Sequence, residues 1–334
     1  MNVGITIHPY QVPLVCPLEL AGEEMAERSG WLIEVTDDNG RTGWGEVAPL
    51  PGVSSAEEMN VLEEWDGERL QGGAVTPSVR NGLDMALFNL GDPDLMPAPL
   101  RELKPLHDRI AVNALLIGTI EDMIKQERAA AREGYRTVKI KVGRLDVAEE
   151  VELLHAINAH ASDETQFRLD ANRAWTPDEA DRYLSVLTEM NVEYIEEPFA
   201  EARASLAWSQ GTGVPVALDE SLRALEPEDL HAFAGLRAAI LKPTALGGFS
   251  RCVAFAKAAA AIGAYPVISA MLESGVGILS MARFAACLTD EEVAAGLDTY
   301  RWLAKDVLDP RPRLSGGCIT ADMWDWSRYR VVVD

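Results

Sequence analysis

From about residue 108 onward, short apolar runs alternate with longer amphipathic segments. The apolar runs have the length of buried strands, and the segments between them carry apolar residues at helical spacing. Residues 119–133 and 146–160 are two predicted helices, and a third begins at Thr176 as N-cap with Pro177 at its first position. This strict alternation of strands and helices predicts an α/β fold with a parallel sheet.

Eight strands are predicted in this part of the chain. The first covers residues 110–117, and the others have marker positions at 139, 170, 196, 219, 242, 269 and 298. Intervals of 23 to 31 residues separate these positions, and each holds one strand–loop–helix–loop unit. We therefore expect a (β/α)8-type, modified TIM barrel with its site at the carboxyl ends of the strands. A doubly wound open sheet is the alternative, but its site would concentrate at one switch point.

Residues 1–98 follow another pattern and predict an α+β capping domain. A turn signal at 37–40, Asp-Asp-Asn-Gly, lies between two strand-like runs and predicts a hairpin. The predicted strands cover 6–10, 31–36 and 41–47, and the predicted helices cover 55–65 and 77–90. The segments 11–30 and 49–54 are predicted to be loops, and the sequence leaves open whether they close over a substrate, a placement that would exclude water.

The barrel is expected over residues 99–304. The remaining segment, 305–334, is expected to return to the capping domain, with Trp324 and Trp326 as packing groups there.

Charged residues stand at the ends of five successive predicted strands. Lys139 and Lys141 alternate with Ile140, so both lysines point to the same face, the barrel interior. The later strands end at Asp170, Glu196, Asp219 and Lys242. Buried charges persist only when they are paired, hydrogen-bonded or bound to metal. Three carboxylates with flanking lysines therefore favour a divalent cation with an acid/base group on each side.

The lysines are expected to differ in role. Lys139 and Lys141 should lower each other's pKa, an effect that nearby carboxylates oppose, and a lysine with a lowered pKa can act as a base. Lys242 is expected across the barrel, with an ion pair to Asp219 as the plainer alternative. The acidic neighbours of the predicted ligands, Glu197 and Glu220, alternate to the other face and are not assigned as ligands.

Composition excludes several classes of partner. Apolar residues make up 48% and charged residues 25% of the chain, as in globular proteins with a sizeable core. The formal net charge of −23 disfavours nucleic acids and anionic membranes as partners. The long apolar stretch 252–272 contains a lysine, a glycine and a proline, and it predicts a helix followed by a buried strand rather than a membrane span.

The cysteines point to a reduced compartment. None of Cys16, Cys252, Cys287 and Cys318 forms a Cys-x-x-Cys pair, so neither a zinc ribbon nor a redox motif is predicted. The N-terminus lacks a basic segment that leads into an apolar run. We therefore expect a cytoplasmic protein without a signal peptide.

The order Lys-x-Lys, Asp, Glu, Asp, Lys on successive strands resembles the enolase superfamily, and within it the muconate-lactonising subgroup. Further stretches resemble the o-succinylbenzoate synthase family of that subgroup. They are residues 43–52, 168–175, 241–248, 268–277 and 296–299. The resemblance covers nearly the whole chain.

This resemblance implies a lyase activity. The implied reaction is the syn-dehydration of 2-succinyl-6-hydroxy-2,4-cyclohexadiene-1-carboxylate to 2-succinylbenzoate through an enediolate, a step of menaquinone or phylloquinone biosynthesis. It also implies Mg²⁺ on Asp170, Glu196 and Asp219, with Mn²⁺ able to substitute. The only partner expected is the small carboxylate substrate, without an obligate protein partner.

The resemblance also implies roles for single residues. Lys141 would abstract the α-proton and then protonate the departing hydroxyl, and Lys242 would stabilise the anion from the other face. Lys139 would keep Lys141 in its working protonation state or contact the substrate carboxylate. The expected substrate-binding residues are Arg168, Asn172, Ser269, Ser274 and Gly275, with Arg168 also orienting the two lysines of the second strand.

Four other functions remain open at this point. An N-acylamino-acid racemase or a dipeptide epimerase of the same superfamily would use the same lysines and ligands. Dipeptide epimerases usually have Asp-x-Asp after the eighth strand, whereas this chain has Asp298-Thr299-Tyr300, which argues against a dipeptide substrate. A cycloisomerase has no motif in its favour. A non-catalytic metal-binding protein is the remote alternative, because all six charged residues are retained.

Overall fold

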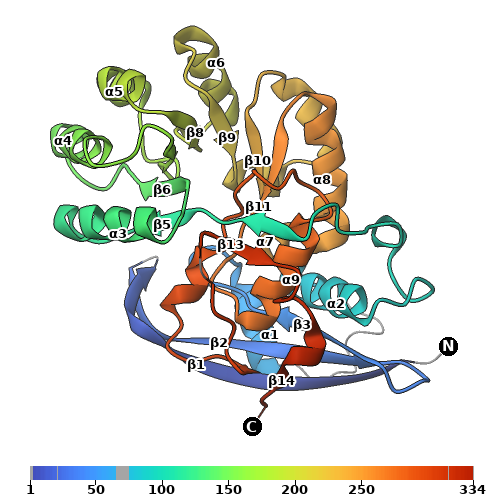
Figure 1. Ribbon diagram of the computed structural model, residues 1–334. Helices are drawn as coiled ribbons and strands as arrows, with labels where there is room; N and C mark the ends of the chain where they lie inside the picture. The colour runs from blue at the N-terminus through green and yellow to red at the C-terminus, as the bar shows by residue number, and fades with distance from the viewer. Residues whose placement is uncertain (1–2, 21, 65–74, 315, 334) are drawn as a thin grey trace.

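The computed structural model describes residues 3–20, 22–64, 75–314 and 316–333. Figure 1 shows an antiparallel sheet beneath a ring of parallel strands that is surrounded by helices. The described residues include no helix that is both long and apolar enough to cross a membrane.

The N-terminal part is the expected α+β unit. Its sheet has the order β1-β2-β3, and α1 and α2 follow it. The bounds are Gly4–Leu20 for β1, Glu23–Thr36 for β2, Thr42–Val47 for β3, Ala56–Glu64 for α1 and Pro77–Leu90 for α2. The predicted helix over 55–65 therefore holds, although its last residue lies outside the described residues.

The prediction of a loop over 11–30 is wrong. Most of this segment is a long antiparallel ladder between β1 and β2, with Tyr10 opposite Gly30 and Val12 opposite Arg28. Prolines in the segment hid the strand pattern, but β1 is an edge strand, and an edge strand tolerates prolines because one row of its N–H groups needs no partner.

Helix α2 lies unusually close to β3. A Cβ atom on Gly45 would come within 1.9 Å of the Gly82 carbonyl oxygen, so only glycine permits this approach. The Gly-Trp-Gly-Glu sequence of β3 thus serves packing at its glycines and leaves Glu46 free for a separate contact with the barrel.

The barrel contains a seven-stranded parallel sheet in the order β11-β10-β9-β8-β7-β6-β5. The strands are Ala114–Leu116 (β5), Thr137–Lys141 (β6), Gln166–Asp170 (β7), Val192–Glu196 (β8), Val216–Leu218 (β9), Ala238–Leu241 (β10) and Tyr265–Ile268 (β11). The other short strands are Arg109–Ala111 (β4), Leu308–Asp309 (β12), Cys318–Thr320 (β13) and Arg330–Val331 (β14).

The prediction of a complete eighth strand is corrected. Residues 293–298 form only isolated parallel bridges, Val112 with Ala295 and Ser269 with Gly296. Backbone hydrogen bonds from 295–296 nevertheless reach both edges of the sheet and join them. The stretch is short because a 3-10 helix begins at Asp298. The first predicted strand, 110–117, is divided as well, since β4 pairs with β13 instead of the barrel.

The helices follow the strands as predicted, and capping boxes at Thr119 and Thr176 fix two of their starts. Their bounds are Ile120–Arg132 (α3), Val147–Asn158 (α4), Pro177–Glu189 (α5), Ala202–Thr212 (α6), Pro243–Leu246 (α7), Phe249–Ala261 (α8) and Gly275–Ala285 (α9). Short 3-10 helices cover Ala98–Leu100 (η2), Glu220–Ala224 (η3), Pro227–Phe233 (η4), Asp298–Trp302 (η5) and Trp326–Arg328 (η6).

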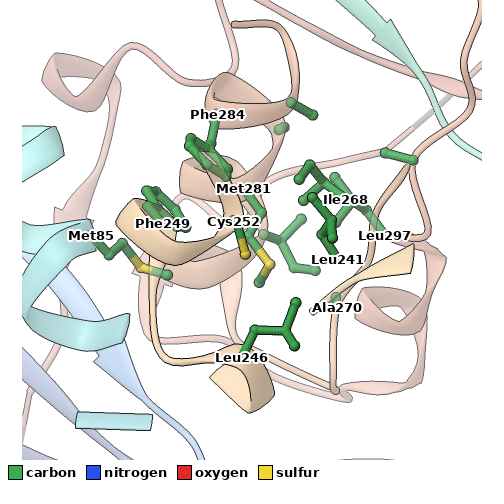
Figure 2. Packing of buried hydrophobic residues seen from close by; sticks show 14 of the residues in the cluster. Met85, Leu241, Leu246, Phe249, Cys252, Ile268, Ala270, Met281, Phe284 and Leu297 are labelled. Carbon is green, nitrogen blue, oxygen red and sulfur yellow. The ribbon is translucent and has the colours of Figure 1, made fainter. Parts of the chain in front are cut away.

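The main hydrophobic core joins the capping unit to the barrel. Figure 2 shows Met85 of α2 beside Phe249 of α8, with Phe284 and Met281 of α9 next to them. The rings of Phe249 and Phe284 stack with centroids 4.1 Å apart. Burial of aromatic side chains contributes roughly 2 kcal/mol or more each, so these contacts hold the two units together.

The C-terminal segment packs against the main core and near the N-terminal unit. Trp324 is buried in the main core, and Trp326 packs against that core from outside. Trp326 also borders a cavity shared with Trp44 of β3 and Asn89 of α2, both in the N-terminal unit.

Candidate active site

The charged marker residues converge because their strands are parallel and in register. Lys141 is aligned with Asp170 on the neighbouring strand, and Asp170 with Glu196 on the next. Asp219 and Lys242 directly follow β9 and β10. Since the carboxyl ends of parallel barrel strands meet at one mouth, all these side chains lie together there.

The two lysines of β6 share one carboxylate. Lys139 Nζ lies 2.8 Å from Asp170 Oδ2 and 2.7 Å from Glu196 Oε2. Lys141 Nζ lies 2.5 Å from the same Asp170 oxygen and 2.8 Å from Asn172 Oδ1. Both lysines therefore point to the same face of the strand, as their spacing predicts.

Lys242 approaches from the other side of the barrel and pairs with Asp219. The expected ion pair between these residues is thus present, together with the placement of Lys242 across from Lys141. The three carboxylates are almost completely buried, with exposures of 0% for Asp170, 1% for Glu196 and 5% for Asp219. Charged groups at such depth need the opposite charges that surround them.

The sequence predicts that the two β6 lysines lower each other's pKa, and the pKa is lowered for one of them, Lys141. Burial lowers the pKa of Lys141, and the charges of Lys139 and Lys242 lower it further despite Asp170. Burial also opposes the charge on Lys139, but Asp170 and Glu196 outweigh burial and raise its pKa. The expectation is wrong for Lys139 because this lysine lies between two carboxylates.

The pKa values of the carboxylates also shift in opposite directions. Burial would raise the pKa of Asp170, but Lys139 and Lys141 hold it well below its usual value. Burial raises the pKa of Glu196 to about 7, and the neighbouring charge of Asp170 adds to this shift. Lys141 is therefore the lysine in this cluster that is best suited to exist as a neutral base.

Strained backbone surrounds the cluster. Asn172, Arg173, Glu197 and Leu272 have positive φ angles of 43°, 66°, 42° and 65°, in the region that favours glycine. All follow the carboxyl end of a barrel strand. Non-glycine residues in this region cost free energy and gather at functional sites, where surrounding contacts hold them.

Glu197 is one residue whose role the sequence left open. Its carboxylate accepts hydrogen bonds from the backbone N–H of Asp219 at 2.9 Å and of Ser221 at 2.8 Å. Arg173 Nε also donates to it, at 3.3 Å. Glu197 thus fixes the backbone that carries Asp219, and it does not face the cluster.

A small cavity of about 90 Å³ opens beside the lysines. Of the expected substrate-binding residues, Ser269 lines it, together with Lys139, Lys141 and Lys242. Sequence reasoning did not propose Asn113, Leu115 or Thr299, which also line it. Asn113 lies in the predicted first strand and Thr299 follows the last marker position, so the strand pattern held a signal for both.

Asn172 lies at the rim of the site. Its Oδ1 accepts from Lys141 Nζ, and its Nδ2 donates to Glu220 at 2.9 Å. The structure therefore places Asn172 next to Lys141, where it orients the ammonium group.

The expectation that Arg168 contacts the substrate is corrected. Its guanidinium donates to Glu193 at 2.6 Å, to the Ala294 carbonyl at 2.6 Å and to Asn113 at 3.2 Å, and the side chain is fully buried. Arg168 does point inward, but it precedes Asp170 by two residues. At roughly 3.3 Å of rise per residue it therefore lies one layer deeper in the barrel.

Ser274 and Gly275 are corrected in the same way. Ser274 Oγ donates to Glu46 of β3 at 2.7 Å, and Gly275 N donates to Asp306 at 2.8 Å. Both residues begin α9 and bind to neighbouring segments of the protein. Ser274 connects the barrel to the capping unit and Gly275 binds the C-terminal segment, and neither lines the cavity.

Asp298 borders the cavity, but its carboxylate is already engaged. Oδ2 accepts from Leu115 N at 2.9 Å and pairs with Arg301 at 3.1 Å, and Tyr135 donates to Oδ1 at 3.2 Å. An oxygen with these partners is poorly placed to bind a substrate ammonium group.

Apolar residues of the β1–β2 hairpin lie beside the turn that follows β11. Leu18, Leu20 and Met25, at the end of the hairpin, pack against Leu50 and Leu272. Parts of the segments 11–30 and 49–54 therefore lie against that turn.

The three carboxylates suit a hard divalent cation in their chemistry. Buried carboxylate oxygens on adjacent strand ends are the ligands that Mg²⁺ prefers. In the part of the chain that the structure describes, no group of three acidic, histidine or cysteine side chains stands ready as a ligand set, because lysines hold these carboxylates.

Two family models match the chain. "Enolase C-terminal domain-like" matches residues 122–323, which is more than half of the chain and most of the barrel. "MenC, N-terminal domain" matches residues 3–90, the capping unit.

Proteins from several organisms are similar to this chain in sequence. The chain is 32% identical to o-succinylbenzoate synthase of Vibrio cholerae serotype O1, over 93% of both chains. It is 30% identical to o-succinylbenzoate synthase of Yersinia enterocolitica, over 96% of this chain and 97% of that one. Protein PHYLLO, chloroplastic, of Arabidopsis thaliana is 28% identical over 91% of this chain, but only 21% of that protein is covered.

Solved structures agree with the fold. Muconate lactonizing enzyme from Pseudomonas fluorescens has a TM-score of 0.80 at 20% identity, over 99% of this chain and 96% of that one. The L-Ala-D/L-Glu epimerase from Bacillus subtilis has a TM-score of 0.77 at 22% identity, over 96% of each chain. At this identity the likeness concerns the fold alone. The family model and the full-length relatives identify the chain as a member of the o-succinylbenzoate synthase family in the enolase superfamily.

Proposed function

We propose that this protein is an o-succinylbenzoate synthase. It would remove water from 2-succinyl-6-hydroxy-2,4-cyclohexadiene-1-carboxylate to give 2-succinylbenzoate, a step of menaquinone or phylloquinone biosynthesis. The near full-length similarity to curated synthases carries this proposal. The complete set of lysines and carboxylates at the barrel mouth supports it from the structure.

In this reaction Lys141 acts twice on one face of the ring. Its neutral amine takes the proton from the carbon next to the carboxylate, and the resulting ammonium gives that proton to the departing hydroxyl, which leaves as water. The lowered pKa of Lys141 makes the first step possible, and the new ammonium is acidic enough for the second. Asn172 holds the Nζ group in place through its Oδ1.

Lys242 keeps its charge on the opposite face. Burial disfavours that charge, but Asp219 and Glu196 outweigh burial and raise the pKa of Lys242. A fixed ammonium group there stabilises the negative charge that spreads over the substrate when its proton is removed. Lys139 remains charged between Asp170 and Glu196 and helps to keep Lys141 neutral.

Asp170, Glu196 and Asp219 would hold Mg²⁺, for which Mn²⁺ can substitute. A divalent cation at this position supplies positive charge to the oxygens of the substrate carboxylate. Ser269, which lines the cavity, is the proposed contact for the rest of the substrate. We expect the protein to act in the cytoplasm on this small carboxylate without an obligate protein partner.

The N-acylamino-acid racemase reaction is the second candidate, because Lys141 and Lys242 reach the carboxylate cluster from opposite sides. A dipeptide epimerase reaction is less consistent with the site. It needs an acid that binds the substrate ammonium, and both oxygens of Asp298 already have protein partners.

A spectrophotometric assay separates these functions. The purified protein is mixed with the cyclohexadiene carboxylate and Mg²⁺, with and without EDTA, and the loss of diene absorbance is followed. Rapid loss that EDTA abolishes is the expected result. Loss no faster than the spontaneous rate, combined with α-proton exchange of N-succinyl amino acids in D₂O, would replace the synthase by the racemase.

A further inference from the structure

A second cavity lies outside the barrel mouth, between the first turns of α2 and α8 and the loop after β10. Its volume is about 440 Å³, and three arginines line it, Arg80, Arg223 and Arg251. The described lining residues include no aspartate or glutamate. The whole chain has 53 acidic and 30 basic residues, so a random patch of its surface would carry more acids than bases.

Two of these arginines have free donor groups. Arg251 pairs with Glu226 at 2.9 Å and donates to the Leu225 carbonyl at 2.9 Å. Arg80 and Arg223 form no close ion pair or side-chain hydrogen bond with any residue in the described parts of the chain, although the charge of Arg80 acts on the Asp84 carboxylate one turn along α2. Like-charged guanidinium groups repel one another, and a bound anion would relieve that repulsion.

The start of α8 already faces a carboxylate of the protein. Ser250 lines the cavity, and its backbone N–H donates to Asp84 at 2.7 Å. Burial raises the pKa of Asp84, and the Ser250 hydroxyl also interacts with that carboxylate and opposes this shift. The guanidinium groups therefore provide the site, and the helix end does not.

We propose that this cavity binds a small anion that carries two negative charges, as phosphate groups or as carboxylates. Arg80 and Arg223 would each bind one anionic group through paired N–H donors, which match the geometry of carboxylate and phosphate. Val75, Pro77 and Leu246 would contact an apolar body between the charges.

The proposed site is distinct from the catalytic one. None of its lining residues borders the cavity beside Lys141 and Ser269. It does adjoin the turn after Lys242, because Ala245 lines it and Ala245 N donates to the Lys242 carbonyl at 3.0 Å. An anion bound here would contact the segment that carries Lys242.

Calorimetric titration of the full chain at constant ionic strength tests the proposal. The probes are inorganic pyrophosphate and phthalate, which present the two charges as phosphates or as carboxylates, and sodium chloride serves as a blank. We expect saturable one-to-one binding of at least one probe. The double variant Arg80→Gln with Arg223→Gln should weaken it by about tenfold or more, because two charge-assisted contacts are removed.

Two controls make the result specific. Arg132→Gln with Arg182→Gln removes the same charge from exposed positions on α3 and α5, which lie on the other side of the barrel (Figure 1), and it should keep the affinity. Lys141→Ala, at the barrel mouth, should also keep it. Equal weakening in both arginine double variants, loss of binding only in Lys141→Ala, or no saturable binding of either probe would each overturn the proposal.

Discussion

At the residue scale, the neighbours of each lysine in the barrel mouth decide whether it stays charged. Lys139 and Lys141 are two positions apart on one strand. The first lies between two carboxylates and remains charged, whereas the second has a lowered pKa. The difference arises from the number of carboxylates that each ammonium group faces.

Replacement of Lys141 by alanine should remove the acid/base group. We expect kcat to fall by about 10²- to 10⁴-fold, the usual contribution of a positioned proton-transfer group. Lys257→Ala, on the exposed face of α8, is the matched control and should leave turnover unchanged. Diene absorbance gives the rate, and circular dichroism checks that both variants fold. Undiminished turnover in Lys141→Ala would remove this lysine from the mechanism.

Asp219→Asn should weaken the cation site. An amide keeps the shape of the side chain but lowers its charge, so the Mg²⁺ concentration for half-maximal activity should rise by at least about tenfold. The shift of the melting temperature on addition of Mg²⁺ should shrink in parallel, which gives a readout independent of turnover. Asp178→Asn, exposed in the first turn of α5, is the control. An unchanged Mg²⁺ requirement would contradict the ligand role of Asp219.

At the element scale, the end of the β1–β2 hairpin and the turn after β11 are held together by a buried arginine. Arg28 of β2 donates to the Leu272 carbonyl at 3.1 Å, to the Pro49 carbonyl at 2.7 Å and to the Ala48 carbonyl. Leu272 has a positive φ of 65°, so this turn needs contacts that keep it in place. The side chain of Arg28 thus holds residues 48–49 and the turn after β11 in position.

Arg28→Met should leave these buried carbonyl groups without donors. We expect the free energy of unfolding to fall by about 3 kcal/mol, because the buried carbonyl groups would lose their hydrogen-bond donors and would not gain contact with water. Urea unfolding followed by tryptophan fluorescence measures the change. Arg330→Met, at the exposed salt bridge with Asp309, should change the urea midpoint little. Equal midpoint shifts in the two variants would show that Arg28 does not fasten these segments.

At the scale of the whole molecule, a buried carboxylate joins the capping unit to the barrel. Glu46 of β3 accepts hydrogen bonds from Ser274 N at 2.9 Å and from Gly277 N at 2.9 Å, at the start of α9. Tyr10 donates to the same carboxylate. Burial raises the pKa of Glu46 to about 7, and the nearby Glu273 adds to the shift. The contact between the two units therefore depends on pH.

Because the folded state raises the pKa of Glu46, the protonated form stabilises the fold. This contribution is complete below about pH 4.5, the ordinary pKa of the group, and it is lost as the pH rises through about 7. The free energy of unfolding of Glu46→Gln, relative to the wild type, should therefore increase between pH 5 and pH 8, with a slope of at most about 1.4 kcal/mol per pH unit. Urea unfolding at several pH values measures it. A difference that stays constant with pH would contradict the raised pKa.

The sequence predicted the fold class from spacing. The regular intervals between strand ends required one helix per strand, and the structure has that alternation through most of the barrel. The strands over 11–30 were not predicted, because prolines and charges interrupt the alternation of apolar and polar residues there. Their pairing with each other is visible only in the structure. The eighth strand was predicted too long, because its length depends on where η5 begins.

The sequence by itself determined which charged residues gather at the barrel mouth. Strand periodicity sets which face a side chain takes, and the parallel strand order sets which end it reaches, so Lys139, Lys141, Asp170, Glu196 and Asp219 could be assigned locally. Only the tertiary structure decided how deep a side chain lies and what it pairs with. Arg168 lies below the site, Ser274 binds Glu46, and Lys139 remains charged, because each outcome depends on partners more than 20 residues away in the chain.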